Sequence, residues 1–217
     1  MESNRTETKP ARTQLVFIID RSGSMSGLEK DTVGGFNSVL SQNREVPGEC
    51  LVTTILFSTD FTVLHDAVPL EQVKDMTLRD YRPGGCTALL DAMGSAITRM
   101  LWQEEPGNVQ FIIITDGEEN SSREYRLSQI REMVTRLQTQ RGWDFLFLGA
   151  NMDAISAAGS LGIRANRAVT SHADVRGTAV QYEAVSEATV AFRCCPSAAV
   201  EDESWKQSVE EDSARRR

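Results

Sequence analysis

The stretch LVFIIDRSGS, residues 15–24, decides the fold of this chain. Its apolar run from Leu15 to Ile19 is rich in β-branched residues and ends at Asp20, a pattern typical of a strand that is buried on both faces. The run FIIITD, residues 111–116, repeats the pattern and ends at Asp116. Because ligands in open α/β folds gather at the carboxyl ends of the strands, these two aspartates indicate where a site would lie.

The rest of the chain alternates strands with helices. Residues 51–57 and 145–148 predict further buried strands, and residues 168–170 predict a short one. Apolar residues with helical spacing occur at residues 33–40, 89–101, 127–137, 153–161 and 175–192. The alternation over residues 62–68 predicts an exposed strand that forms a hairpin with the strand before it. We therefore predict an α/β fold, doubly wound, with a mainly parallel central sheet, one antiparallel edge strand and helices on both faces.

The composition changes after residue 193. From Cys194 onward the sequence is rich in Ser, Glu, Asp, Lys and Arg, and Pro196 would interrupt a continuing helix. We predict one folded domain over residues 13–193, with flexible tails at residues 1–12 and 194–217. The polar N-terminal residues lack the apolar centre of a signal peptide, so we expect a cytoplasmic protein.

The charge of the chain argues against two classes of partner. The 217 residues carry a formal net charge of -8, so their field repels phosphate backbones and anionic lipid headgroups. No run approaches the roughly 20 apolar residues that a membrane span needs. We expect no nucleic-acid and no membrane partner. The cysteines lack the paired spacing of a zinc site and favour buried or idle thiols; they are Cys50, Cys86, Cys194 and Cys195.

The loop after the first strand offers oxygen ligands at alternate positions. Asp20, Ser22 and Ser24 can direct one carboxylate and two hydroxyls at one point, because Gly23 lets the backbone turn tightly. Oxygen ligands without Cys or His suit Mg²⁺, Mn²⁺ or Ca²⁺, and octahedral Mg²⁺ is our first choice. Taken alone, the same pattern also describes a loop whose Ser or Asp caps the next helix.

Two further loops complete the pattern. Residues 82–92 read RPGGCTALLDA, and residues 114–120 read ITDGEEN. With its three loops in this order and spacing, the sequence resembles the von Willebrand factor A (VWA) domain, and in particular small stand-alone bacterial or phage members. The resemblance covers roughly residues 13–192 and implies a complete metal-ion-dependent adhesion site (MIDAS). The metal ligands that it implies are Asp20, Ser22, Ser24, Thr87 and Asp116.

The resemblance implies metal-bridged protein binding, and we expect no enzyme. With only two carboxylates, Asp20 and Asp116, a bound Mg²⁺ or Mn²⁺, or less suitably Ca²⁺, stays Lewis-acidic toward a further anion. A protein partner would fill the open position with an Asp or Glu carboxylate. Glu118 and Glu119 would repel an acidic partner unless they turn away, and Arg21 could offset part of their charge.

Two other functions stay open at this point. Relatives of the fold accompany ATPases, so the chain could be a regulatory or scaffold subunit of a multi-protein ATPase or stress-response complex. A strand-end aspartate with Mg²⁺ also describes phosphohydrolases. However, a phosphatase of the haloacid dehalogenase type needs a second Asp where this chain has Ser22, and a Ser nucleophile needs a base. His65 and His172 fall away from the three loops, and we expect both at the surface.

Other residues near the loops have structural explanations. Asp91 suits the start of a helix, or else orients the second loop. We expect Gly84 and Gly85 to form a backbone turn, since the Lys of a nucleotide-binding loop is missing. Asn151 or Asp153 is expected to cap a helix. The sequence leaves the oligomeric state open.

Overall fold

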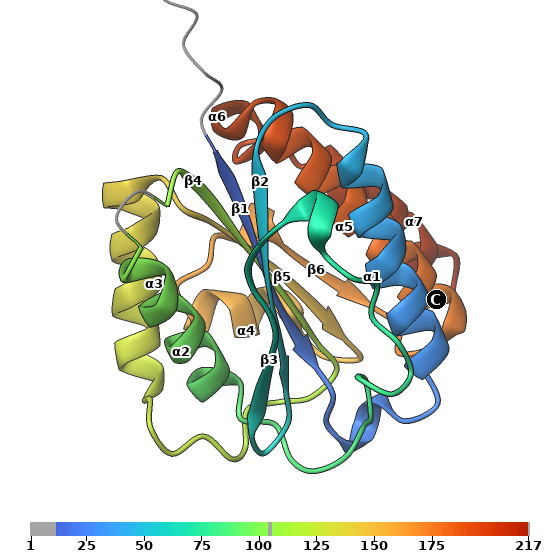
Figure 1. Cartoon of the computed structure of the whole chain (residues 1–217). Helices are drawn as coiled ribbons and strands as arrows, with labels where there is room; N and C mark the ends of the chain where they lie inside the picture. Colours follow the sequence, from blue (N-terminus) through green and yellow to red (C-terminus); the bar gives the residue numbers. More distant parts are fainter. Residues whose placement is uncertain (1–11, 104–105, 217) are drawn as a thin grey trace, which may run out of the picture.

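A computed structural model describes residues 12–103 and 106–216. These residues form one six-stranded sheet and the helices that cover it. The strands follow the order β3-β2-β1-β4-β5-β6. Their bounds are β1 Thr13–Asp20, β2 Cys50–Phe57, β3 Phe61–Pro69, β4 Asn108–Thr115, β5 Asp144–Ala150 and β6 Ala168–Ser171. All neighbours pair in parallel except β3, which pairs antiparallel with β2 at the edge. The predicted α/β fold is therefore confirmed (Figure 1).

The antiparallel edge strand follows from a short connection. Only residues 58–60 join β2 to β3, and the Ser58 backbone N–H donates to the Asp60 carbonyl across this turn at 2.6 Å. A connection of this length can make only a hairpin, because a parallel crossover needs about a dozen residues. The pairing has register shifts near Thr54, and it confirms the hairpin predicted over residues 62–68.

Helices cover both faces of the sheet. The two long helices α1 (Glu29–Arg44) and α5 (Val175–Cys194) pack on one face, and α2 (Leu89–Leu101), α3 (Leu127–Arg141) and α4 (Ala154–Ser160) pack on the other (Figure 1). The strand β1 shows why both faces are apolar. Leu15, Phe17 and Ile19 belong to the core beneath α1 and α5, whereas Val16 and Ile18 belong to the core beneath α2 and α3.

The C-terminal prediction is wrong over residues 194–216. These residues form α6 (Pro196–Ala199), a 3₁₀ turn at Ser204–Lys206 and α7 (Gln207–Arg215), and they pack against α5 and β6. Pro196 does end α5, as expected, but it also occupies the first position of α6. The polar composition concealed two apolar anchors, because Trp205 and Val209 are each only 2% exposed.

A buried arginine explains why this segment stays on the domain. The Arg167 guanidinium pairs with the buried Asp144 carboxylate, with Nε 3.0 Å from Oδ1. Its Nη1 donates to the carbonyls of Ala199 and Asp202, and its Cζ lies 5.4 Å from the centre of the Trp205 ring. One buried cation thus joins the starts of β5 and β6 to the C-terminal segment.

Three other predictions have different outcomes. The tail predicted at residues 1–12 lies outside the described residues except for Arg12, whose carbonyl accepts from the Asn108 backbone N–H at 2.9 Å. His65 is buried rather than at the surface, since its ring stacks on Phe36 beneath α1 and its Nδ1 lies 3.0 Å from Thr54 Oγ1. None of the helices in the described ranges is long and apolar enough to cross a membrane.

Replacing Trp205 tests whether the C-terminal segment belongs to the fold. We expect Trp205→Ala to lower the free energy of unfolding by about 3–5 kcal/mol, because it empties a filled core position. Trp102 is the matched control, since it is 83% exposed and its replacement by Ala should change stability by no more than about 0.5 kcal/mol. Urea unfolding measures both. Equal effects of the two substitutions would contradict this packing.

Candidate metal centre

The predicted site lies at the carboxyl ends of β1 and β4. Asp20 is the last residue of β1, and Asp116 directly follows β4. The chain leaves β1 toward β2 on one side, and it leaves β4 toward β5 on the other. The connections therefore diverge at this point and leave a crevice above the sheet, where ligands of open α/β folds bind.

Asp20 is fully buried and accepts hydrogen bonds on both carboxylate oxygens. The Ser22 backbone N–H donates to Oδ1, and the Thr115 hydroxyl donates to Oδ2, both at 2.6 Å. The Tyr81 hydroxyl donates to the Asp20 carbonyl at 2.5 Å. Burial raises the pKa of Asp20, opposed by these bonds, and the nearby Asp116 carboxylate raises it further. The fold thus holds the Asp20 carboxylate in place without pairing it with a basic side chain of the described residues.

The two serines connect Asp20 to Asp116. Ser22 and Ser24 flank Gly23 at a single 3₁₀ turn, Gly23–Met25, and their hydroxyl oxygens lie 3.0 Å apart. The Ser24 hydroxyl donates to Asp116 Oδ1 at 2.6 Å. Burial raises the pKa of Asp116 as well, and the hydrogen bond from Ser24 lowers it. Two carboxylates and two hydroxyls therefore share one small region.

Gly117 shows that Thr87 belongs to the same region. A Cβ atom on Gly117 would lie 2.9 Å from Thr87 Oγ1, 3.7 Å from Ser24 Oγ and 3.8 Å from Asp20 Oδ2. Oxygens of the first two loops thus converge on the space that a side chain at Gly117, in the third loop, would fill. All five predicted site residues are brought together.

Glycines join the first loop to the second. The Gly23 N–H donates to the Gly85 carbonyl at 3.1 Å, and the Gly84 N–H donates to the Arg21 carbonyl at 2.8 Å. Gly85 has a φ of +82°, and a Cβ there would lie 2.7 Å from Thr59 Oγ1. Only glycine fits this position without strain. The predicted backbone turn is confirmed.

Two residues whose structural roles the sequence did not reveal, Asn120 and Glu119, hold the third loop in place. Asn120 clamps Thr87, because its Oδ1 accepts from the Thr87 N–H at 2.9 Å and its own N–H donates to the Thr87 carbonyl at 3.0 Å. Glu119 caps α2 from outside, since its carboxylate accepts the Leu90 N–H at 3.0 Å. Their signal in the sequence is a carboxylate and an amide three and four residues after Asp116.

Asp91 has the predicted place at a helix start and a second role that differs from the prediction, because it holds the third loop and not the second. It lies in the first turn of α2. Its carboxylate also accepts three backbone N–H groups of the third loop, from Arg123, Glu124 and Tyr125, at 2.8–2.9 Å. Asp153 is the helix cap that was expected, accepting from the Ser156 N–H at 3.0 Å.

The charges around the site differ in part from expectation. Arg21 does not offset the acidic residues, because its Nη2 pairs with Asp60 Oδ1 at 2.9 Å. Glu119 turns away from the site, and its four hydrogen bonds go to Leu90, Ser121 and Ser122. Glu118 stays exposed, without an ion pair to any described residue. One free carboxylate therefore borders the site in place of two.

The donor set fits a hard divalent cation. The converging side chains offer carboxylate and hydroxyl oxygens, which suit Mg²⁺, Mn²⁺ or Ca²⁺. Among the described residues no three His, Cys, Asp or Glu side chains form a metal-binding group, so a cation here would depend on the hydroxyls. Cys86 precedes Thr87 and is exposed, and its backbone N–H donates to Thr59 Oγ1 at 2.8 Å.

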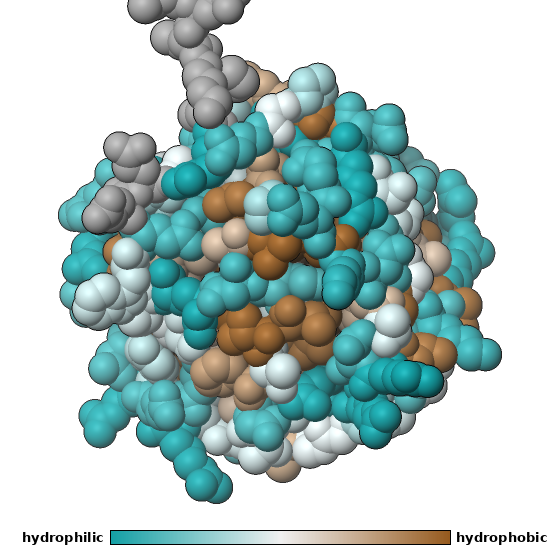
Figure 2. All heavy atoms as spheres, viewed as in Figure 1, coloured by the Kyte–Doolittle hydropathy of each residue, from teal (hydrophilic) through white to brown (hydrophobic). Residues whose placement is uncertain are grey.

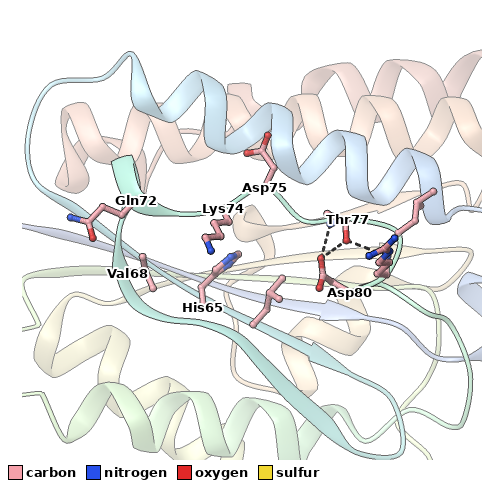
Figure 3. Close-up of a pocket in the computed structure, with 10 residues that line it drawn as sticks. His65, Val68, Gln72, Lys74, Asp75, Thr77 and Asp80 are labelled. Carbon is pink, nitrogen blue, oxygen red and sulfur yellow. Dashed lines mark hydrogen bonds between the residues drawn. The ribbon is translucent and has the colours of Figure 1, made fainter.

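A second hollow, of about 810 Å³, lies away from the strand ends. It separates β3 from residues 72–80, and Figure 3 shows the His65 ring beside Lys74 within it. Leu64 and Val68 form its apolar wall, and Figure 2 shows apolar atoms gathered over β3. None of the five site residues lines this groove, so it does not belong to the candidate metal centre.

The doubly wound sheet and the three converging loops define a VWA domain. The sequence matches the family described as "VWA domain containing CoxE-like protein" over residues 1–185. The chain belongs to this family. No curated protein matches the sequence.

Solved structures share the fold at low identity. Proximal thread matrix protein 1 of the mussel byssus is 14% identical with a TM-score of 0.59, and the match covers 84% of this chain and 47% of that chain. The same protein with a zinc-occupied MIDAS motif has a TM-score of 0.60 at 14% identity, with the same coverage. The D319A mutant of the PilB minor pilin from Streptococcus sanguinis is 12% identical with a TM-score of 0.57, covering 86% of this chain and 64% of that chain. The chain thus spans about half the length of the mussel protein, and these matches show the fold alone.

Removing the Asp91 carboxylate tests how the third loop is held. We expect Asp91→Ala to lower the free energy of unfolding by about 2–3 kcal/mol, because three backbone donors lose a charged acceptor. Trypsin should then cleave faster after Arg123 and Arg126. Asp66→Ala is the control, since Asp66 makes only an exposed ion pair with Arg99 and its loss should cost less than about 1 kcal/mol. Unchanged tryptic cleavage in Asp91→Ala would rule out this role.

Proposed function

We propose that the chain is a protein-binding module that depends on a divalent metal. The observation that carries the proposal is the convergence of oxygens from the first two loops on Gly117, together with the hydrogen bond from Ser24 to Asp116 in the third loop. In this proposal Asp20, Ser22, Ser24, Thr87 and Asp116 form a complete MIDAS that holds the cation. The zinc-occupied MIDAS motif of the mussel protein, which has the same fold, is consistent with a cation at this place.

The proposed cation is Mg²⁺ or Mn²⁺, because the same oxygen ligands suit both ions. Both accept oxygen ligands in octahedral geometry, whereas Ca²⁺ prefers a larger set with more carboxylates. The loops supply two carboxylates, which only balance the charge of a divalent ion. A bound ion would therefore offer its remaining coordination position to a further anion. We propose that an Asp or Glu carboxylate of a protein partner takes it.

Binding explains the residues of the site better than turnover does. A hydrolase needs a group that can accept a proton close to the ion. The Glu119 carboxylate is engaged in four hydrogen bonds, and His65 is buried on β3 under α1. Of the two carboxylates that follow Asp116, Glu118 alone stays exposed beside the site, and the other loop residues position ligands. The cytoplasmic location stays a prediction.

Titration with metal tests the proposal. Because a ligand that binds only the folded state raises its stability, Mg²⁺ or Mn²⁺ at a hundredfold excess over Kd should stabilise the wild type by about 2.7 kcal/mol relative to EDTA. Gly117→Ala should abolish this gain, since its Cβ would occupy the space between the oxygens. Gly34→Ala is the control, because a Cβ there meets nothing within 4 Å. Thermal unfolding with and without metal gives all these values.

We expect Asp116→Asn to raise the melting temperature without metal but to reduce the stabilisation that metal provides. In EDTA it should raise the melting temperature, because it removes the charge of a half-buried carboxylate beside the buried carboxylate of Asp20. In metal it should lose most of the stabilisation, because one of the two anionic ligands is gone. A wild type that responds no more than Gly117→Ala, or Asp116→Asn that responds fully, would count against the proposed site.

A further inference from the structure

A pocket of about 420 Å³ opens beside the candidate metal centre and plays no part in the site described so far. It lies between the start of α2, the loop after β4 and helix α4. Its apolar wall comes from Leu89, Leu90, Phe147 and Leu161. Gly117 lines it as well, and Gly117 is the residue around which the site oxygens converge. A chain that reached the metal centre would therefore also border this pocket.

The rim of the pocket is acidic. Glu118 and Asp153 line it, and neither makes an ion pair with a described residue. The Asp153 carboxylate accepts the Ser156 N–H at the start of α4 at 3.0 Å. Leu127, at the start of α3, adds an apolar side chain that is 46% exposed. The hollow thus combines an apolar interior with carboxylates at its edge.

We propose that this pocket binds an apolar side chain of the same partner segment whose carboxylate fills the metal position. The acidic rim specifies a Lys or Arg in that segment, which would lie against Glu118 and Asp153. The inference rests on the proposed function and names the partner's chemistry: an acidic residue, with a large apolar residue and a basic residue within a few positions of it. An extended chain advances about 3.3 Å per residue, so one short segment can span centre and pocket.

The acidic rim also bears on how an acidic partner can approach. The whole chain carries a net charge of -8, so a partner that offered only carboxylates would be repelled before it reached the metal. A basic residue beside the coordinating carboxylate removes this repulsion. Burial of the apolar residue supplies affinity that a single carboxylate on a metal does not.

Selection of peptides by the full chain tests the inference. A library of random peptides is selected on the immobilised protein in Mn²⁺, and bound peptides are released with EDTA. We expect the released peptides to contain Asp or Glu close to Leu, Met or Phe and to Lys or Arg. Replacing the apolar residue of one selected peptide by Ala should weaken its binding about tenfold or more, because a buried side chain returns to water.

Variants of the protein locate the contact. Ser156 is exposed on α4 and lines the pocket, so Ser156→Phe should fill it and weaken the selected peptide about tenfold. Ile155→Phe is the matched control, because Ile155 is exposed on the same helix and does not line the pocket. Glu118→Lys should weaken the same peptide. Ser156→Phe and Ile155→Phe should keep the stabilisation by Mn²⁺, which shows that the fold and the metal centre are intact.

The outcomes separate the two proposals. Peptides that are released by EDTA but show no apolar preference, or that bind Ser156→Phe as tightly as wild type, would overturn the pocket assignment and leave the metal-dependent function standing. If the wild type self-associates and Ser156→Phe abolishes this association, the pocket would instead be assigned to a second copy of the chain, and the inference would be overturned. Peptides that EDTA does not release, together with no stabilisation by Mn²⁺, would overturn both proposals.

Discussion

The buried carboxylate of Asp20 is the constraint on which the rest of the site depends. It ends the central strand β1, receives hydrogen bonds from Ser22 and Thr115, and has no basic partner among the described residues. Desolvation of a charge is costly unless an opposite charge or strong hydrogen bonds offset it. The hydroxyls next to Asp20, the missing side chain at Gly117 and the second carboxylate at Asp116 are all explained if a divalent cation completes the site.

The third loop gives this constraint its geometry. Asn120 fixes the backbone of Thr87, Glu119 caps α2, and Asp91 on α2 holds the loop in return. Each carboxylate or amide satisfies backbone donors that a folded loop would otherwise leave unpaired. The loop and α2 therefore position each other. The contact with Asn120 holds Thr87 through its backbone, and this places the Thr87 hydroxyl at the site.

The sequence predicted the sheet and helices because each element carries its own periodicity, from the apolar run of β1 to the alternation of β3. Strand ends of a parallel sheet meet at one edge, so the position of Asp20 and Asp116 indicated where the site lies. The full set of five residues came only from the resemblance to the VWA domain. It did not predict the fold of residues 194–216, because their anchors are few and depend on Arg167, a partner distant in the chain. The burial of His65 and the role of Glu119 were hidden for the same reason: both depend on contacts that local pattern does not encode.

The most direct measurement is anomalous X-ray scattering from crystals of the protein grown with Mn²⁺. The account predicts one strong anomalous peak at the carboxyl ends of β1 and β4, with oxygens of Asp20, Ser22, Ser24, Thr87 and Asp116 around it, directly or through water. No peak there at saturating Mn²⁺, or a peak held by other residues, would contradict the claim that these three loops form a metal centre.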